Sequence, residues 1–402
     1  MASLTFTAQT PAQVSAQAAA TASLNTSGGT ITLTASSSVT AASTASITAN
    51  ATIAPAPADN LAIAGNGGSI SITAPQVVTQ LGSVMQANGN NGPGGNFNLQ
   101  ATQLSIAGSV QANGNTGGII TALASVSNLQ AGSLIQANGN NGPGGAITFQ
   151  TINKQVISNA QIQANGSGNG GNIQISTTSG NINLQSAIIQ TNGANGRGGQ
   201  IGIAATNYTS IESSIVEATG YIQGGTIKVG NDAQTNTLPF SIFTSLDTAS
   251  ILNSSQTNLG NTTSGGYIET SGQELRQFAT INTGIGGMWL VDPYDVTIDF
   301  STANNINAAL NAGTSVTIQT TATPTCSVSC TKSYSSGNGD ITVSSPVSKT
   351  VTNGSPTLTL TAYRNININA AIGNTKGTLN SIFTSAGTTT ITSAITTSGT
   401  QT

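Results

Sequence analysis

The sequence predicts an all-β protein that folds as a right-handed parallel β-helix. Three observations predict it: a tetrapeptide that returns every 25 to 27 residues, a glycine pair followed by an alternating apolar strand in most repeats, and no stretch long enough for a crossover helix. Each repeat is too short to bury its apolar side alone, so neighbouring repeats must stack and share one core. Equivalent residues would then lie about 4.8 Å apart on successive coils.

The tetrapeptide Gln-Ala-Asn-Gly marks the repeat. It begins at residues 86, 111, 136 and 163, and related forms begin at 190 and 217. Its asparagines are Asn88, Asn113, Asn138, Asn165 and Asn192. The favoured interpretation is that each Asn-Gly pair supplies the positive φ angles of a tight turn. The other is an inward column of hydrogen-bonded asparagines, as in stacked cross-β structures.

A glycine pair followed by a short alternating strand is the second marker. Examples are Gly-Gly-Asn-Ile-Gln-Ile at 170–175 and Gly-Gly-Gln-Ile-Gly-Ile at 198–203. Alternation with a period of two places the isoleucines of each strand on one face. A β-propeller blade needs about 40–45 residues, and leucine-rich repeats need a leucine pattern that is missing here. A coil of a parallel β-helix fits the repeat best.

The repeat pattern divides the chain into three regions. Residues 1–60 are rich in Ala, Thr and Ser and predict irregular coils, residues 61–287 hold the regular array, and residues 288–402 continue as a β-rich segment. A short helical turn fits Ile306 to Leu310. The first residues lack the basic and apolar parts of a signal peptide, and neither end shows a cap over its strand edges. We therefore expect a segment of a longer protein, whose edges would allow association end to end.

Composition excludes several functions. Of 402 residues, only 8 are Lys or Arg, 11 are Asp or Glu, and none is His. Without His, neither a His-assisted nucleophile nor a His-containing zinc site can form. The scattered basic residues make no phosphate-neutralising patch, so no nucleic-acid partner is expected. The apolar runs are far shorter than the roughly 20 residues of a membrane-spanning helix. No cofactor is expected.

Two stretches of the sequence carry a resemblance. Residues 265–272 read Gly-Gly-Tyr-Ile-Glu-Thr-Ser-Gly, and residues 287–298 read Gly-Met-Trp-Leu-Val-Asp-Pro-Tyr-Asp-Val-Thr-Ile. Over roughly residues 210–320 the chain resembles the junction of filamentous-haemagglutinin-like adhesins, with Trp289, Asp292, Pro293 and Asp295 in the junction motif. The amino-terminal secretion domain of that family, with its Asn-Pro-rich motifs, is not visible in this sequence.

The resemblance implies a β-helical passenger segment of a large exoprotein, secreted or held at the outer membrane of a Gram-negative bacterium. Such proteins cross the outer membrane through a dedicated barrel transporter, in two-partner secretion. The implied function is a non-catalytic stalk or adhesive segment that contacts a glycan or protein receptor on a host cell or other surface. Without the secretion domain, this chain is not expected to be exported alone.

The acidic cluster of the junction predicts a turn rather than a catalytic site. Asp295 and Asp299 on one strand would lie about 13 Å apart, at 3.3 Å per residue, which exceeds the carboxylate separation of glycosidases. Asp292-Pro293 fits a turn with solvated carboxylates; calcium remains a minor alternative. Trp289, the single Trp, belongs to an apolar run and is expected to fill the core rather than to stack on a sugar.

The two cysteines, Cys326 and Cys330, lie four residues apart. A straight strand would hold them about 13 Å apart, beyond the reach of a disulfide. A turn would bring them together, so the sequence favours a small disulfide-closed loop in an oxidising compartment over free thiols.

Two other functions remain open. A polysaccharide-degrading β-helix is disfavoured because the chain lacks His, has only three Arg and offers no close pair of carboxylates. An ice-binding β-helix needs flat columns of Thr, and runs such as residues 388–390 do not recur at the coil spacing.

Overall fold

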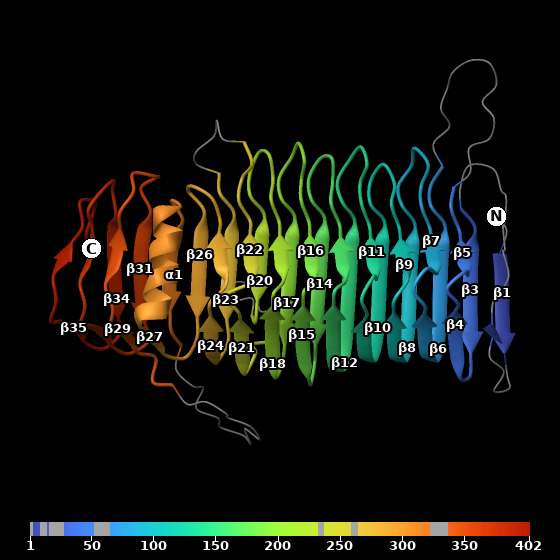
Figure 1. The fold of residues 1–402 in the computed structure, drawn as a ribbon, viewed down its shortest axis with the longest axis horizontal. Coiled ribbons are helices and arrows are strands. Elements are labelled where there is room, and N and C mark those ends of the chain that lie inside the picture. Colours follow the sequence, from blue (N-terminus) through green and yellow to red (C-terminus); the bar gives the residue numbers. More distant parts are fainter. Residues whose placement is uncertain are drawn as a thin grey trace, which may run out of the picture.

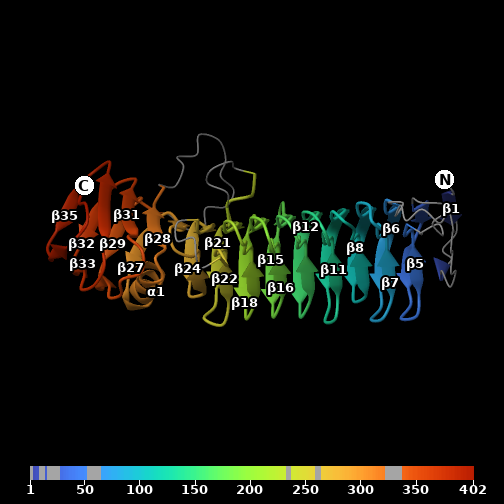
Figure 2. The ribbon, with the colours of Figure 1, turned by 90° about the horizontal axis from the view of Figure 1, so that it is seen from above.

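The computed structural model describes residues 3–8, 14–15, 28–51, 65–231, 237–258, 264–321 and 337–402, with only the backbone of 3–8 and 14–15. The chain is a parallel β-helix, so the predicted fold is confirmed. Successive coils lie side by side along one long axis, in sequence order from the blue N-terminal end to the red C-terminal end (Figure 1). Figure 2 shows the same order of coils from above.

The longest ladder of parallel strands, which we call face A, runs the length of the described chain. Its strands are β1 (Ser3–Ala8), β3 (Thr30–Ala35), β6 (Ser69–Thr79), β8 (Asn96–Ile106), β10 (Ile119–Leu129), β12 (Ala146–Ser158), β14 (Asn172–Thr177), β17 (Gln200–Ala205), β20 (Thr226–Val229), β23 (Tyr267–Ser271), β26 (Met288–Asp292), β28 (Ser315–Gln319), β31 (Thr357–Ala362) and β34 (Asn380–Ser385).

Two shorter ladders form the other sides of the coils. Face B contains β2 (Val14–Ser15), β4 (Ser38–Ala41), the second halves of β6, β8, β10 and β12, then β15 (Asn181–Gln185), β18 (Tyr208–Glu212), β21 (Phe243–Leu246) and β24 (Glu274–Gln277). Face C contains β5 (Ser46–Thr48), β7 (Val84–Gln86), β9 (Ser109–Gln111), β11 (Leu134–Gln136), β13 (Gln161–Gln163), β16 (Ile188–Gln190), β19 (Ile215–Glu217), β22 (Ile251–Asn253) and β25 (Thr280–Asn282).

Alternation builds one continuous core. On face A the inward residues stand directly opposite one another from coil to coil and are buried. One such column is Ile31, Ile70, Phe97, Ile120, Ile147, Ile173, Ile201, Ile227, Ile268, Trp289, Val316 and Leu358. Because every coil adds apolar area to the same core, neighbouring coils stabilise one another.

The glycine pairs let the backbones of successive coils approach closely at the corner before face A. A Cβ atom on Gly170 would collide with the carbonyl oxygen of Thr191, and one on Gly171 with the carbonyl oxygen of Gly145. Neither glycine has a positive φ angle. The pair is needed for space, not for an unusual backbone conformation.

A helix interrupts the pattern after β27 (Val296–Ile298). The sequence predicts only a short helical turn near Ile306, whereas α1 (Phe300–Asn311) has 12 residues. Asp299 caps its N-terminus, accepting a hydrogen bond from Thr302 N at 2.9 Å. α1 packs against β25 and β30 (Val347–Lys349), so it occupies the place of a face C strand between them.

From β27 onward, two short ladders accompany face A. One contains β27, β29 (Ile341–Val343), β32 (Ile366–Ile368) and β35 (Thr389–Ile391). The other contains β30, β33 (Ile372–Asn374) and β36 (Ile395–Thr396).

Candidate functional site

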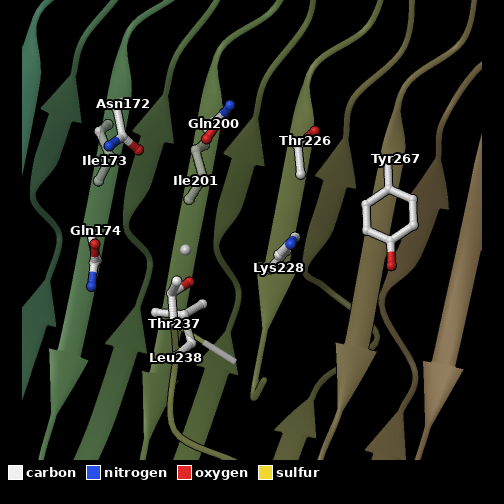
Figure 3. A pocket seen from close by; sticks show the side chains of 11 residues that line it. Asn172, Ile173, Gln174, Gln200, Ile201, Thr226, Lys228, Thr237, Leu238 and Tyr267 are labelled. Atoms are coloured by element: carbon white, nitrogen blue, oxygen red, sulfur yellow. The ribbon is translucent and has the colours of Figure 1, made fainter. Parts of the chain in front are cut away.

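A groove of about 570 Å³ lies on the outer side of face A, over β14, β17, β20 and β23 (Figure 3). Two rows of outward residues line it, because alternate residues of a strand point to the same side. The first row is Asn172, Gln200, Thr226 and Tyr267, and the second is Gln174, Gly202 and Lys228. The isoleucines between the two rows belong to the buried core column.

Leu238, from the segment that joins β20 to β21, forms one wall of the groove. It is 7% exposed, and a Cβ atom on Gly202 would lie 3.0 Å from its Cδ1 atom. At Gly230, directly after β20, φ is +84°. The backbone N–H of Ser241 donates to Gly230 O at 2.8 Å, and the hydroxyl of Ser241 donates to Ala205 O at 2.7 Å. Gly202 thus leaves the space into which Leu238 packs.

The amide side chains of the groove have no internal partners. The side chains of Asn172, Gln174 and Gln200 make no hydrogen bond within the described part of the chain. Asn172 and Gln200 are exposed and Gln174 is half-buried. Their donors and acceptors therefore face the groove, where a ligand or water can use them.

Opposite charges neighbour each other at one end of the groove. Lys228 on β20 stands opposite Glu269 on β23 in the register of face A. Glu269 is fully buried and accepts hydrogen bonds from the hydroxyls of Tyr267 at 3.2 Å and Ser271 at 3.1 Å. Opposite charges at such positions attract each other, so this end of the groove carries little net charge.

Asp292 is not the solvated carboxylate that the sequence predicts. It ends β26 opposite Ser271 and is only 4% exposed, and its Oδ1 atom has no hydrogen-bond partner among the described residues. Burial, together with the negative charge of Glu269, raises the pKa of Asp292 to about 7. The expectation is wrong because the strand continues through Asp292, and the chain bends only at Tyr294, after the buried Pro293.

The other two acidic residues of the junction are exposed and serve separate local structures. The carboxylate of Asp295 accepts hydrogen bonds from the backbone N–H groups of Asn338 and Asp340. Asp299 caps α1. The three carboxylates therefore each have a different role and do not form one reactive group.

Trp289 lies in the core column of face A and is 1% exposed. Its indole N–H donates to the hydroxyl of Thr270 at 3.0 Å. The ring has no exposed surface on which a sugar could stack.

The repeated asparagines form a half-buried hydrogen-bonded column beside face C. The side-chain oxygen of each accepts the backbone N–H of the next, at 2.8 Å from Asn88 to Asn113 and onward to Asn192. None of the five has a positive φ angle, and neither do the glycines that follow them. The favoured turn interpretation is therefore wrong. The hydrogen-bonded column of the alternative interpretation is confirmed, but its side chains are half-buried rather than inside the core.

A second column of amides, which the sequence analysis missed, runs beside the first. Within it the Nε2 atom of Gln136 donates to Gln163, Gln163 donates to Gln190, and Gln190 donates to Glu217, at 2.8 to 3.0 Å. We call the asparagine and glutamine columns together the amide ladder. The signal was the first residue of the same tetrapeptide, which returns in the same register as the asparagine.

The predicted disulfide between Cys326 and Cys330 lies outside the described residues. Within the described ranges, no helix is long and apolar enough to cross a membrane, and no three acidic or cysteine side chains gather as metal ligands would.

No protein-family model matches this chain, and no curated protein or solved structure shows a significant match to it.

Proposed function

We propose that this chain is a rigid, non-catalytic segment of a large secreted or surface-exposed adhesin of a Gram-negative bacterium. It extends the adhesin away from the cell and contacts a host cell or another surface. The whole adhesin would be exported by two-partner secretion, through a barrel transporter in the outer membrane. The receptor would be a glycan or a protein.

One observation supports the proposal most: the two stretches that resemble the adhesin junction form one packed unit. They lie on β23 and β26, which pair in register, so that Ile268 stands opposite Trp289 and Ser271 opposite Asp292. Trp289 is bonded to Thr270 across the pair. The resemblance therefore concerns residues that act together at the place where the regular coils end and α1 begins.

The geometry of the rod agrees with a stalk. Within the described residues, face A continues without a missing strand from β1 to β34, and the core column follows it from Ile31 on β3 to Leu358 on β31. A solenoid in which each coil contacts only its neighbours gains length by adding coils and keeps its stiffness.

Neither alternative function gains a specific observation. Thr30, Thr32 and Thr34 on β3 stand opposite Ser69, Ser71 and Thr73 on β6, which would suit an ice-binding face. However, the next strand of face A, β8, carries Asn96, Asn98 and Gln100 at these positions, so the hydroxyl rows do not continue. A degrading enzyme would need acidic side chains that face a substrate. In the junction, Asp292 is buried, Asp299 caps α1 and Asp295 accepts backbone hydrogen bonds.

A binding assay on the full 402-residue chain tests the proposal. We expect saturable binding of the purified chain to cultured epithelial cells, with circular dichroism showing a strand-rich fold in the same sample. A well-folded sample that does not bind cells or surface glycans would contradict an adhesive role for this segment.

A further inference from the structure

We propose, building on the adhesin function above, that the groove on face A is a binding site for a neutral glycan. The groove, with Leu238 as its wall and β14, β17, β20 and β23 as its floor, falls within the range of about 300–1,000 Å³ typical of small-ligand sites. The amides that make no internal hydrogen bond, the aromatic ring of Tyr267 and the balance of charge point to this class of ligand.

The free amides supply the hydrogen bonds that a sugar needs. Asn172, Gln174 and Gln200 each offer two N–H donors and one carbonyl acceptor, and none is used within the described chain. Sugar hydroxyl groups both donate and accept, so they match side chains that do the same. In the amide ladder the same groups form hydrogen bonds with one another.

Tyr267 supplies an apolar surface at the β23 end of the groove. Its hydroxyl is held by Glu269 at 3.2 Å, which fixes the side chain. In Figure 3 the ring is seen face-on, beside Thr226 and Lys228, with Asn172 and Gln174 on the far side of the groove and Gln200 between. A ring held in this way can pack against the C–H face of a sugar while the amides bind its hydroxyl groups.

The charge around the groove favours a neutral ligand over an acidic one. Among the described residues that line the groove, Lys228 is the only cationic one, and Glu269 stands opposite it on the next strand. The chain as a whole carries a formal charge of −3. An acidic glycan would therefore find no excess of positive charge here.

The floor of the groove depends on Gly202, which lies between Gln174 and Lys228 in the same outward row. A longer side chain at this position would enter the space in which Leu238 packs and would displace this wall of the groove. It would push against the flexible end of Leu238 rather than against backbone, so the coil should still form. Gly202→Gln is therefore a variant that disrupts the groove and keeps the rod.

Isothermal titration calorimetry on the full chain tests the site. The neutral probes are oligomers of glucose, mannose and N-acetylglucosamine, and the acidic probes are oligogalacturonate and heparin fragments. We expect at least one neutral oligomer to bind and Gly202→Gln to abolish that binding. Tyr267→Ala should weaken it about tenfold, by loss of stacking, whereas Tyr267→Phe keeps the ring and most of the affinity.

Asn172→Ala has a matched control in Asn96→Ala. Both asparagines are exposed, lie in the same outward row of face A and make no side-chain hydrogen bond within the described residues, but Asn96 is on β8, outside the groove. Loss of one or two hydrogen bonds at Asn172 should weaken binding about fivefold. Asn96→Ala should leave the affinity unchanged.

The possible results separate this site from the proposed function. Binding of a neutral oligomer that is lost in Gly202→Gln supports the site, even if the chain does not bind cells. Cell binding that survives Gly202→Gln, without binding of any neutral oligomer, overturns the site and leaves the adhesin function standing. Preference for the acidic probes, or equal losses in Asn172→Ala and Asn96→Ala, also overturns it.

Discussion

The amide ladder beside face C and the groove on face A use the same residue types in opposite ways. In the ladder, Asn138 and Gln163 are bonded to the coils before and after them. In the groove, Asn172 and Gln200 have no bond to the described chain. The difference lies in repetition: in the ladder the same amide returns in the same register on successive coils, whereas in the groove Asn172 stands opposite a longer amide, Gln200, and Gln174 stands opposite Gly202. A regular column therefore stabilises the rod, and an irregular one stays available for binding.

The largest change in the free energy of unfolding should come from the inward side of β17, and its outward side should contribute little. Ile201→Ala, on the inward side of β17, removes part of the core column and should lower the free energy of unfolding by about 2–5 kcal/mol. Gln200→Ala, on the outward side, should change it by less than about 0.5 kcal/mol. Urea unfolding followed by circular dichroism measures both. Similar losses for the two variants would mean that Gln200 is part of the structural framework.

Unlike the uncharged amides of the ladder and the groove, the buried carboxyl group of Asp292 should make the stability depend on pH. Because the pKa of Asp292 is about 7 in the folded chain and near 3.8 in the unfolded chain, the folded state holds a proton that the unfolded state has lost between these values. Stability should therefore fall as the pH rises from 4 to 7, on the order of 2–4 kcal/mol from this group, and then level off.

Asp292→Asn isolates this contribution from those of other carboxylates. The variant cannot ionise, so the wild-type stability relative to the variant should decline between pH 4 and 7. Thermal or urea unfolding of both proteins at each pH gives the difference. Parallel curves for the two proteins would show that Asp292 is not buried as described.

Removing one side chain from the asparagine column should lower the free energy of unfolding by less than removing one from the core. Asn138→Ala removes the acceptor for the backbone N–H of Asn165 and should lower the free energy of unfolding by about 1–3 kcal/mol. Asn172→Ala, with no bond to lose, is the matched control and should be nearly neutral. Equal effects of the two substitutions would remove the contrast between ladder and groove.

A gap in the glutamine column should have the smallest effect. Gln163→Ala breaks half-buried side-chain bonds to Gln136 and Gln190 and should cost about 1 kcal/mol. Gln200→Ala provides the control from the groove. Chemical unfolding of both variants measures the difference. If Gln163→Ala lowered the free energy of unfolding by several kcal/mol, the glutamines would matter as much as core residues.

The repeat predicts the rod because both of its signals are local. The return of one apolar residue and one glycine pair per coil is enough to place Ile173 opposite Ile201. The helix was underestimated because its buried residues, such as Ala303 and Ile306, are few, and because its cap, Asp299, resembled part of an acidic cluster.

The groove could not be predicted from the repeat. It depends on the absence of a side chain at Gly202 and on the contact of Leu238 with that position. The two residues are 36 positions apart, and no repeat of the sequence predicts their contact. The burial of Asp292 escaped prediction for a related reason, since Asp-Pro signals a turn locally while the register of β26 keeps the carboxylate beside Ser271.

We propose that this segment contacts a surface through side chains that the rod does not use for itself. The most direct test compares binding of the wild-type chain, Asn96→Ala and Gly202→Gln to the same cultured epithelial cells. We predict saturable binding by the first two and a clear loss in Gly202→Gln. The absence of saturable binding by all three, in samples with strand-rich circular dichroism spectra, would contradict the claim.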